Sequence, residues 1–350
     1  MDTGRGLGLL TAMVVLACVG LALGQGPAGP YQGPAGPGGQ AVERGQAIAP
    51  PDLTIRPPEP AIRPRAPLYP ASPDRGGVPV GPPAHGVPFV LSPEEMFQLD
   101  QVLNAWEQRN KEIKSFECDF TRFDYDYVFG QGGEPRRLRD EGILKYAAPD
   151  KGLYKVDGEK SVEWKEKRVG AKELGSWEKF AGDRSEQWIC DGRSIFEYKY
   201  QVPPKEPKRR IEYPLPPECQ GKAISEGPLP FVFGTDAQKL KQRYFLRLTT
   251  PADVKGEIWL EAYPRWQQDA GSYRKVDLIL KTTGLLPDAI QITEPNGRDR
   301  KVYKFENVVV NRRGRIFEGN WFQAPLPLGW KAELEQPPAG AQASRTPGRR

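Results

Sequence analysis

The chain has 350 residues, with 50 basic and 45 acidic side chains, a formal net charge of +5 and a single histidine, His85. This small positive excess has no concentrated basic face, which excludes a typical nucleic-acid-binding protein. Histidine supplies most zinc ligands and the base of nucleophilic triads, so one histidine in a Pro-rich stretch argues against that chemistry. We expect no cofactor, no metal and no enzymatic activity.

Residues 1–24 predict an export signal. Arg5 precedes a stretch, residues 7–23, that is free of charge and rich in Leu, Val, Ala and Gly. Small residues at the −3 and −1 positions predict cleavage before Gln25. The alternatives are a lipoprotein signal ending before Cys18, which would then be acylated, and an uncleaved anchor, because the stretch nearly reaches the ~20 residues that span a bilayer. The expected location is therefore periplasmic or secreted, with membrane tethering as the alternative.

Residues 25–88 are dominated by Pro, Gly and Ala and predict a disordered tether. The pentapeptide Gly-Pro-Ala-Gly-Pro occurs twice in this stretch at a seven-residue offset, which breaks the three-residue glycine frame of collagen. Residues 331–350 have a similar composition and predict a disordered tail. Residues 89–330 remain, and their length suits one large β-rich domain.

Three cysteines, Cys118, Cys190 and Cys219, lie in this domain. An exported protein folds in an oxidising compartment, so we expect one disulfide and one buried thiol. The spacing does not select the pair.

The domain begins with a predicted helix. Ser92 is the expected N-cap, Pro93 occupies the first helical position, and Glu95 completes a capping box. Leu91 and Met96 are placed as a hydrophobic staple across this cap. One apolar stripe follows at helical spacing, formed by Met96, Leu99, Val102, Leu103, Trp106 and Ile113. Such a stripe packs on a sheet or forms part of a lid over a pocket, and the sequence leaves both open.

After the helix the apolar period changes to two. Phe116, Cys118 and Phe120 alternate with acidic residues, and beyond Arg122 the aromatic residues move to odd positions. A shift by one residue moves side chains to the opposite face of a strand. The pattern therefore predicts a bulge or bend near Thr121 and Arg122.

Further strands are predicted at 142–146, 152–156, 186–190, 194–200, 244–248, 256–263, 273–281, 289–293 and 301–310, with a short helix at 237–242. Asp191 and Gly192 form the clearest hairpin turn. A three-residue loop would pair Trp188 with Phe196, whereas a two-residue loop would pair Trp188 with Ile195. The register stays open.

In this order, the segments resemble the carrier fold of the bacterial outer-membrane lipoprotein chaperones. The matching segments are the helix, Ser115-Phe116, Phe120-Thr121-Arg122, 142–149, Cys190-Asp191-Gly192, 195–198, Leu229-Pro230-Phe231, Phe305, Asn307, Asn311, 322–325 and Leu328-Gly329-Trp330. The chain also resembles secreted proteins of planctomycete-type bacteria that share this domain and have no assigned activity. The resemblance implies an α+β fold in which a strongly curved antiparallel sheet forms an incomplete β-barrel covered by a few helices. It also implies an apolar interior that receives acyl chains.

The chain differs from the carrier family at two places that matter for how the family transfers lipoproteins. The family commonly has an arginine before the proline that matches Pro149 and uses it to hold the lid closed, but this chain has Ala148. Residues 159–182 are an insertion by this comparison, charged and containing Trp164 and Trp177. Fold alone does not transfer function.

The leading hypothesis is an exported, monomeric, non-catalytic carrier or binder of apolar ligands, namely the acyl chains of lipids or lipoproteins. Sites for such ligands are concave and mostly apolar. We expect the lining to comprise Phe116, Phe120, Trp188, Phe196, Leu278 and Leu280 on the sheet, with Met96, Leu99 and Leu103 on the covering helix. The competing interpretation is that each of these residues belongs to an ordinary hydrophobic core.

The alternative function is an envelope scaffold or protein-interaction module with a packed core. An enzyme ranks third: the pairs Asp124/Asp126 and Glu257/Glu261 could serve as catalytic carboxylates, but such spacing is common on exposed strands.

Overall fold

The computed structural model describes residues 86–169, 172–202, 206–221, 223–224, 231–232, 236–312 and 320–335. The expected export signal, Cys18, the tether before residue 86, Leu229, Pro230 and the tail beyond residue 335 lie outside the described residues.

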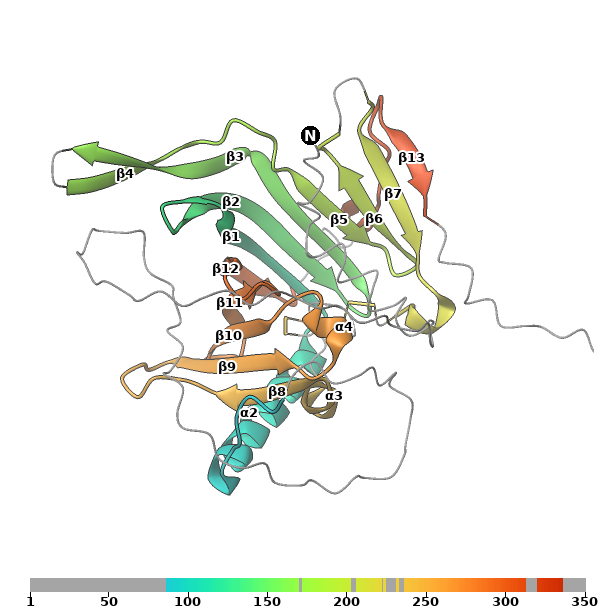
Figure 1. Cartoon of the computed structure of the whole chain (residues 1–350). Coiled ribbons are helices and arrows are strands. Elements are labelled where there is room, and N and C mark those ends of the chain that lie inside the picture. Colours follow the sequence, from blue (N-terminus) through green and yellow to red (C-terminus); the bar gives the residue numbers. More distant parts are fainter. Residues whose placement is uncertain are drawn as a thin grey trace, which may run out of the picture.

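The described part of the chain forms the following helices, 3₁₀ turns and strands (Figure 1). The helices are α2 (Pro93–Glu112), α3 (Ala237–Arg243) and α4 (Gln267–Ala270), with 3₁₀ turns η1 (Pro217–Cys219) and η3 (Asn320–Phe322). The strands are β1 (Ser115–Gln131), β2 (Glu134–Ala147), β3 (Lys151–Val169), β4 (Lys172–Lys179), β5 (Glu186–Cys190), β6 (Ser194–Lys199), β7 (Arg209–Pro214), β8 (Tyr244–Leu248), β9 (Glu257–Pro264), β10 (Lys275–Lys281), β11 (Pro287–Thr293), β12 (Arg300–Val310) and β13 (Lys331–Leu334).

All of these strands belong to one sheet. Its order is β13-β7-β6-β5-β3-β2-β1-β12-β11-β10-β9-β8, and β4 pairs with β3 outside this path. Every pairing is antiparallel except that of β13 with β7. The end strands β13 and β8 do not pair with each other, so the curved sheet stays open, and α2 and α3 lie beside β8 (Figure 1). The fold is therefore the predicted α+β incomplete barrel.

Helix α2 begins as the sequence predicts. The Glu95 backbone N–H donates to Ser92 Oγ at 3.2 Å, and the Ser92 N–H donates to Glu95 Oε2 at 2.7 Å, which confirms the capping box. The helix buries Leu99, Leu103 and Trp106. These residues follow the i, i+4, i+7 spacing of one helical face.

Of the bulge or bend expected near Thr121 and Arg122, the bulge is absent. The pairing of β1 with β2 and β12 is regular on both sides of Arg122, and the shift against β12 falls between Glu117 and Asp119. Arg122 continues the row of inward-facing side chains after Phe120 and is itself buried. The aromatic residues beyond it stand at odd positions and therefore lie on the opposite face of the same regular strand. In the apolar pattern of the sequence, a buried polar side chain therefore looks the same as a change of register.

The β5–β6 hairpin adopts neither of the two expected registers. Cys190 pairs with Ile195 and Trp188 with Glu197, so the loop is longer than either alternative. The Asp191 carboxylate accepts N–H bonds from Arg193 and Ser194, both at 2.8 Å, and this side-chain turn accommodates the additional residue.

The apparent insertion at 159–182 extends β3 and adds β4, which together project from the sheet as a hairpin arm (Figure 1). Trp164 pairs with Trp177, and their rings meet edge to face at 5.5 Å. The Arg139 guanidinium lies 5.3 Å from the Trp177 ring centroid and connects the base of the arm to β2.

The expected disulfide is not formed. Cys118, Cys190 and Cys219 are buried thiols. Cys118 lies near the start of β1, and the Cys190 thiol donates to the Asp150 carbonyl at 3.2 Å. Burial raises the pKa of both thiols, that of Cys190 to about 12, so both are protonated at neutral pH.

The ordered domain continues beyond the expected boundary at residue 330. Strand β13 pairs with β7, and the segment before it covers the outer side of β6. The Tyr198 hydroxyl donates to the Pro325 carbonyl at 2.7 Å, and the Trp330 ring meets the Tyr200 ring at 5.0 Å. The predicted tail therefore starts at least four residues too early.

Candidate functional site

One face of the sheet is almost entirely apolar, and we call it the inner face. Every second side chain along the strands from β5 to β8 points to this face. These side chains form one continuous cluster, in which each is no more than 8% exposed. Its members on the sheet include Phe116, Phe120, Leu144, Tyr154, Trp188, Leu246, Leu260, Leu278, Leu280, Ile290 and Phe305. An apolar surface of this extent suits apolar ligands or a well-packed core.

The inner face is covered by two helices and the chain segment before the second of them, rather than by a second sheet. Helix α2 contributes Leu99, Leu103 and Trp106 to the cluster. The segment between β7 and α3 contributes Leu215, Cys219, Ala223, Phe231 and Val232, and α3 contributes Ala237 and Leu240. We call these three parts the cover.

Asp150 attaches the cover to the sheet. Its buried carboxylate accepts the backbone N–H of Ala223 at 3.0 Å and that of Ile224 at 2.7 Å. Asp150 lies in the turn between β2 and β3, directly after Pro149. Hydrogen bonds to a charged acceptor contribute about 1.5–3 kcal/mol each, so this contact is one of the stronger links of the cover.

Two further polar contacts join the helices of the cover to each other. Glu107 of α2 accepts the N–H of Ala237 at 3.0 Å, at the start of α3. Asp100 pairs with Lys241 at 2.9 Å. The hydrogen bonds of Glu107 to Lys111 and Ala237 lower the pKa of its carboxyl, which therefore stays ionised at neutral pH.

The inner face ends in a buried ion cluster. Arg122 donates through Nε to Asp140 at 2.9 Å and through Nη1 to Glu186 at 2.9 Å and to the Tyr154 hydroxyl at 3.1 Å. Arg184 donates through Nε to Asp140 at 2.9 Å. The Phe120 ring stacks on Tyr154 at 5.2 Å, so the apolar surface directly adjoins the charged groups.

Ion pairing dominates the electrostatics of this cluster. Burial alone would raise the pKa of Asp140, but Arg122, Arg184 and the Ser161 hydroxyl, which donates at 2.6 Å, outweigh it and lower the pKa to about 2. Burial and the neighbouring Tyr303 and Glu186 raise the pKa of Tyr154 well above its usual range. The cluster therefore closes one end of the apolar surface with fixed charges.

Seven of the nine residues predicted to line a ligand site lie together in the inner-face cluster. They are Phe116, Phe120, Trp188, Leu278, Leu280, Leu99 and Leu103. Phe196 belongs to a separate cluster on the opposite face, because its partner Ile189 faces away from Trp188. Met96 is 44% exposed at the first turn of α2. These two placements differ from the expectation.

Sequence reasoning missed Asp140, Asp150 and the role of Arg122. The only signal for Arg122 was that it continues the even-numbered row of Phe116, Cys118 and Phe120. The acidic pairs considered as catalytic groups are engaged elsewhere: Asp124 pairs with Arg184 at 3.0 Å and Glu261 with Lys275 at 3.0 Å.

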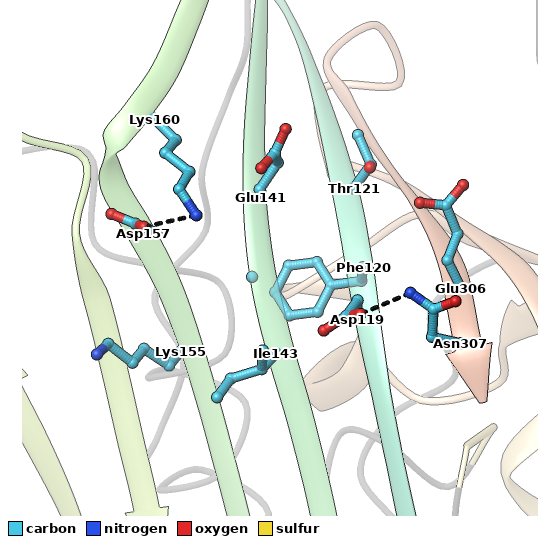
Figure 2. A pocket seen from close by; sticks show the side chains of 11 residues that line it. Asp119, Phe120, Thr121, Glu141, Ile143, Lys155, Asp157, Lys160, Glu306 and Asn307 are labelled. Carbon is cyan, nitrogen blue, oxygen red and sulfur yellow. Dashed lines mark hydrogen bonds and ion pairs between the residues drawn. The ribbon is translucent and has the colours of Figure 1, made fainter. Parts of the chain in front are cut away.

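A pocket of about 510 Å³ lies on the other face of β1, β2, β3 and β12 (Figure 2). Six charged residues contribute to its lining: Asp119, Glu141, Lys155, Asp157, Lys160 and Glu306. Asn307 donates to Asp119 at 2.7 Å, and Lys160 pairs with Asp157 at 3.2 Å (Figure 2). This polar lining does not suit an acyl chain.

Within the described residues, no helix is both long enough and apolar enough to cross a bilayer. In the same part of the chain, no three His, Cys, Asp or Glu side chains gather in a way that could hold a metal ion.

No family model matches the sequence. No curated protein matches it either. Among solved structures, the chain is similar to an uncharacterized conserved protein of Thermus thermophilus, with 8% identity and a TM-score of 0.35 over 68% of this chain and 99% of that one. It is similar to the MucA/MucB complex of Pseudomonas aeruginosa, with 15% identity and a TM-score of 0.29 over 65% of this chain and 61% of that one. It is also similar to a LolA superfamily protein of Nitrosomonas europaea, with 10% identity and a TM-score of 0.27 over 63% of this chain and 96% of that one.

Proposed function

We propose that this protein is an exported, non-catalytic binder and carrier of apolar ligands, which are the acyl chains of lipids or lipoproteins. The observation that supports it is the continuous apolar inner face, covered by parts attached through a few polar contacts. The predicted signal and tether at residues 1–88 fit a protein that works in the cell envelope.

Ligand binding requires the cover to move, because the inner-face side chains are buried beneath it. An acyl chain would replace the contacts of Leu103, Phe231 and Leu240 with its own methylenes, each contributing about 0.8 kcal/mol on burial. The apparent affinity then depends on the fraction of molecules in which the cover is open. Loosening the Asp150 contact should raise this fraction.

The test is a titration of the full chain with a fluorescent long-chain fatty acid. We expect saturable binding, and tighter apparent binding for Asp150→Asn, because the amide weakens the bonds to Ala223 and Ile224. Asp253→Asn, an exposed change in the β8–β9 loop, is the matched control and should bind as the wild type does. If neither the wild type nor Asp150→Asn binds fatty acid, the proposed function is wrong.

The second candidate is an envelope interaction module with a permanently packed core. The complete burial of the inner-face cluster favours it. In that case Asp150→Asn would lower the stability without creating any affinity for fatty acids.

A further inference from the structure

The tip of the β1–β2 hairpin exposes two adjacent apolar side chains. Val128 and Phe129 are each 70% exposed. Adjacent side chains of a regular strand point to opposite faces. Here the pairing with β2 is interrupted between Asp126 and Gln131, and both side chains lie in solvent.

The backbone of this tip is held in a defined shape. The Asp126 carboxylate accepts the N–H of Val128 at 2.9 Å and that of Phe129 at 3.0 Å. The Tyr127 N–H donates to Asp299 at 2.7 Å, which fixes the tip to the neighbouring β11–β12 turn. A side chain at Gly130 would lie 2.0 Å from the Glu134 carbonyl oxygen, so the strands approach closely there.

Two arginines from the neighbouring turn lie against tyrosines of the hairpin. The Arg298 guanidinium is 4.9 Å from the Tyr127 ring centroid, and that of Arg300 is 4.6 Å from the Tyr125 ring centroid. Arg298 is exposed, whereas Arg300 is half-buried and its Nε has no hydrogen-bond partner among the described residues. The charge of Arg298 is therefore accessible to an external anion, while the nearby carboxylates of Asp126 and Asp299 accept backbone N–H groups of the tip.

We propose that this hairpin tip docks onto an anionic lipid bilayer. A projecting apolar dipeptide inserts readily into a deformable phase, whereas a protein partner would have to offer a matching pocket. Tyrosine rings favour the membrane–water interface, and arginine is attracted to anionic headgroups. In the alternative of an uncleaved anchor, the charge-free residues 7–23 would also hold the chain at a membrane, and the Pro-rich stretch after them is long enough to let the hairpin reach its surface.

This proposal does not use the inner face, so it can fail while the proposed function holds. The test measures hydrogen exchange of the full chain with vesicles of phosphatidylcholine alone and of phosphatidylcholine mixed with phosphatidylglycerol. We expect exchange at residues 126–131 to slow several-fold with the anionic vesicles only. Unchanged exchange with both kinds of vesicle would overturn the proposal, and would leave a protein partner as the explanation of the exposed tip.

Paired variants isolate the contribution of the tip, because the N-terminal sequence is the same in every protein compared. Val128→Ser/Phe129→Ser should lose the protection, and Arg298→Gln/Arg300→Gln should reduce it. Leu326→Ser/Leu328→Ser, a change of exposed apolar residues elsewhere, is the control and should keep it. Full protection in the Val128→Ser/Phe129→Ser variant, with the thermal melting of the wild type, would also contradict docking through the tip.

Discussion

Arg122 and Asp140 form an ion pair inside the barrel, with Nη2 and Oδ2 2.8 Å apart and side chains that are 2% and 0% exposed. Their strands are adjacent, and residue 122 pairs directly with residue 140. This pair makes one end of an otherwise apolar interior polar, and therefore limits how far an acyl chain could extend along β1.

Removal of one partner of this pair should be costly. Arg122→Met leaves the buried Asp140 with Arg184 as its one cationic partner beside the Ser161 hydroxyl, and it removes the bond to Glu186. Breaking a buried ion pair in this way costs about 3–5 kcal/mol. Urea unfolding measures the loss, and Arg193→Met, at an exposed position, is the control. A loss no larger than that of Arg193→Met would show that the pair does not stabilise the fold.

The lowered pKa of Asp140 predicts a pH dependence. A carboxyl with a pKa of about 2 in the folded protein and ~3.9 in the unfolded chain stabilises the fold above the higher value. This contribution is lost as the pH falls through the lower value. Between pH ~4 and pH ~2, the wild type should lose about 2 kcal/mol more free energy of unfolding than Asp140→Asn. Parallel curves for the two proteins would contradict this assignment.

Gly142 is required by the packing of Phe120. A Cβ at residue 142 would lie 2.3 Å from Cζ of the Phe120 ring and 2.4 Å from the Lys155 carbonyl oxygen. Gly142→Ala should therefore lower the free energy of unfolding by about 1–3 kcal/mol, because the ring and a neighbouring backbone must both shift. Gly86→Ala, with open space around it, should change stability little. Equal melting temperatures for the two variants would show that Phe120 does not pack over Gly142.

The buried thiols should resist modification in the folded protein. At pH ~8, Cys118 and Cys190 should stay unlabelled by iodoacetamide, because burial raises the pKa of both and limits access. Unfolding in guanidinium without reductant should allow all three domain cysteines to be labelled, as peptide mass spectrometry can detect. A requirement for reductant would mean that a disulfide is present.

The local structure could largely be predicted from the sequence. The cap at Ser92, the strand at 186–190 and the helix near Ala237 depend on nearby residues, whose spacing is visible along the chain. The curved open sheet also agrees with the expectation, because alternating apolar residues predict a sheet with one buried face.

The polar parts of the candidate site could not be predicted. Asp150 contacts residues more than 70 positions away, and Arg122 contacts Glu186 across 64 positions, so neither contact has a local signal. Strand β13 was missed because its short, polar sequence gains its stability from pairing with β7. Phe196 was misplaced because a hairpin loop one residue longer moves it to the opposite face.

The most direct test of acyl-chain binding is a native mass spectrum of the full chain, purified after export and examined before and after addition of fatty acids and lipopeptides. The account predicts bound species of lipid mass, either co-purified or acquired on addition, and more of them for Asp150→Asn than for the wild type. A spectrum that shows only the unbound protein mass for both proteins, even with added lipid, would contradict it.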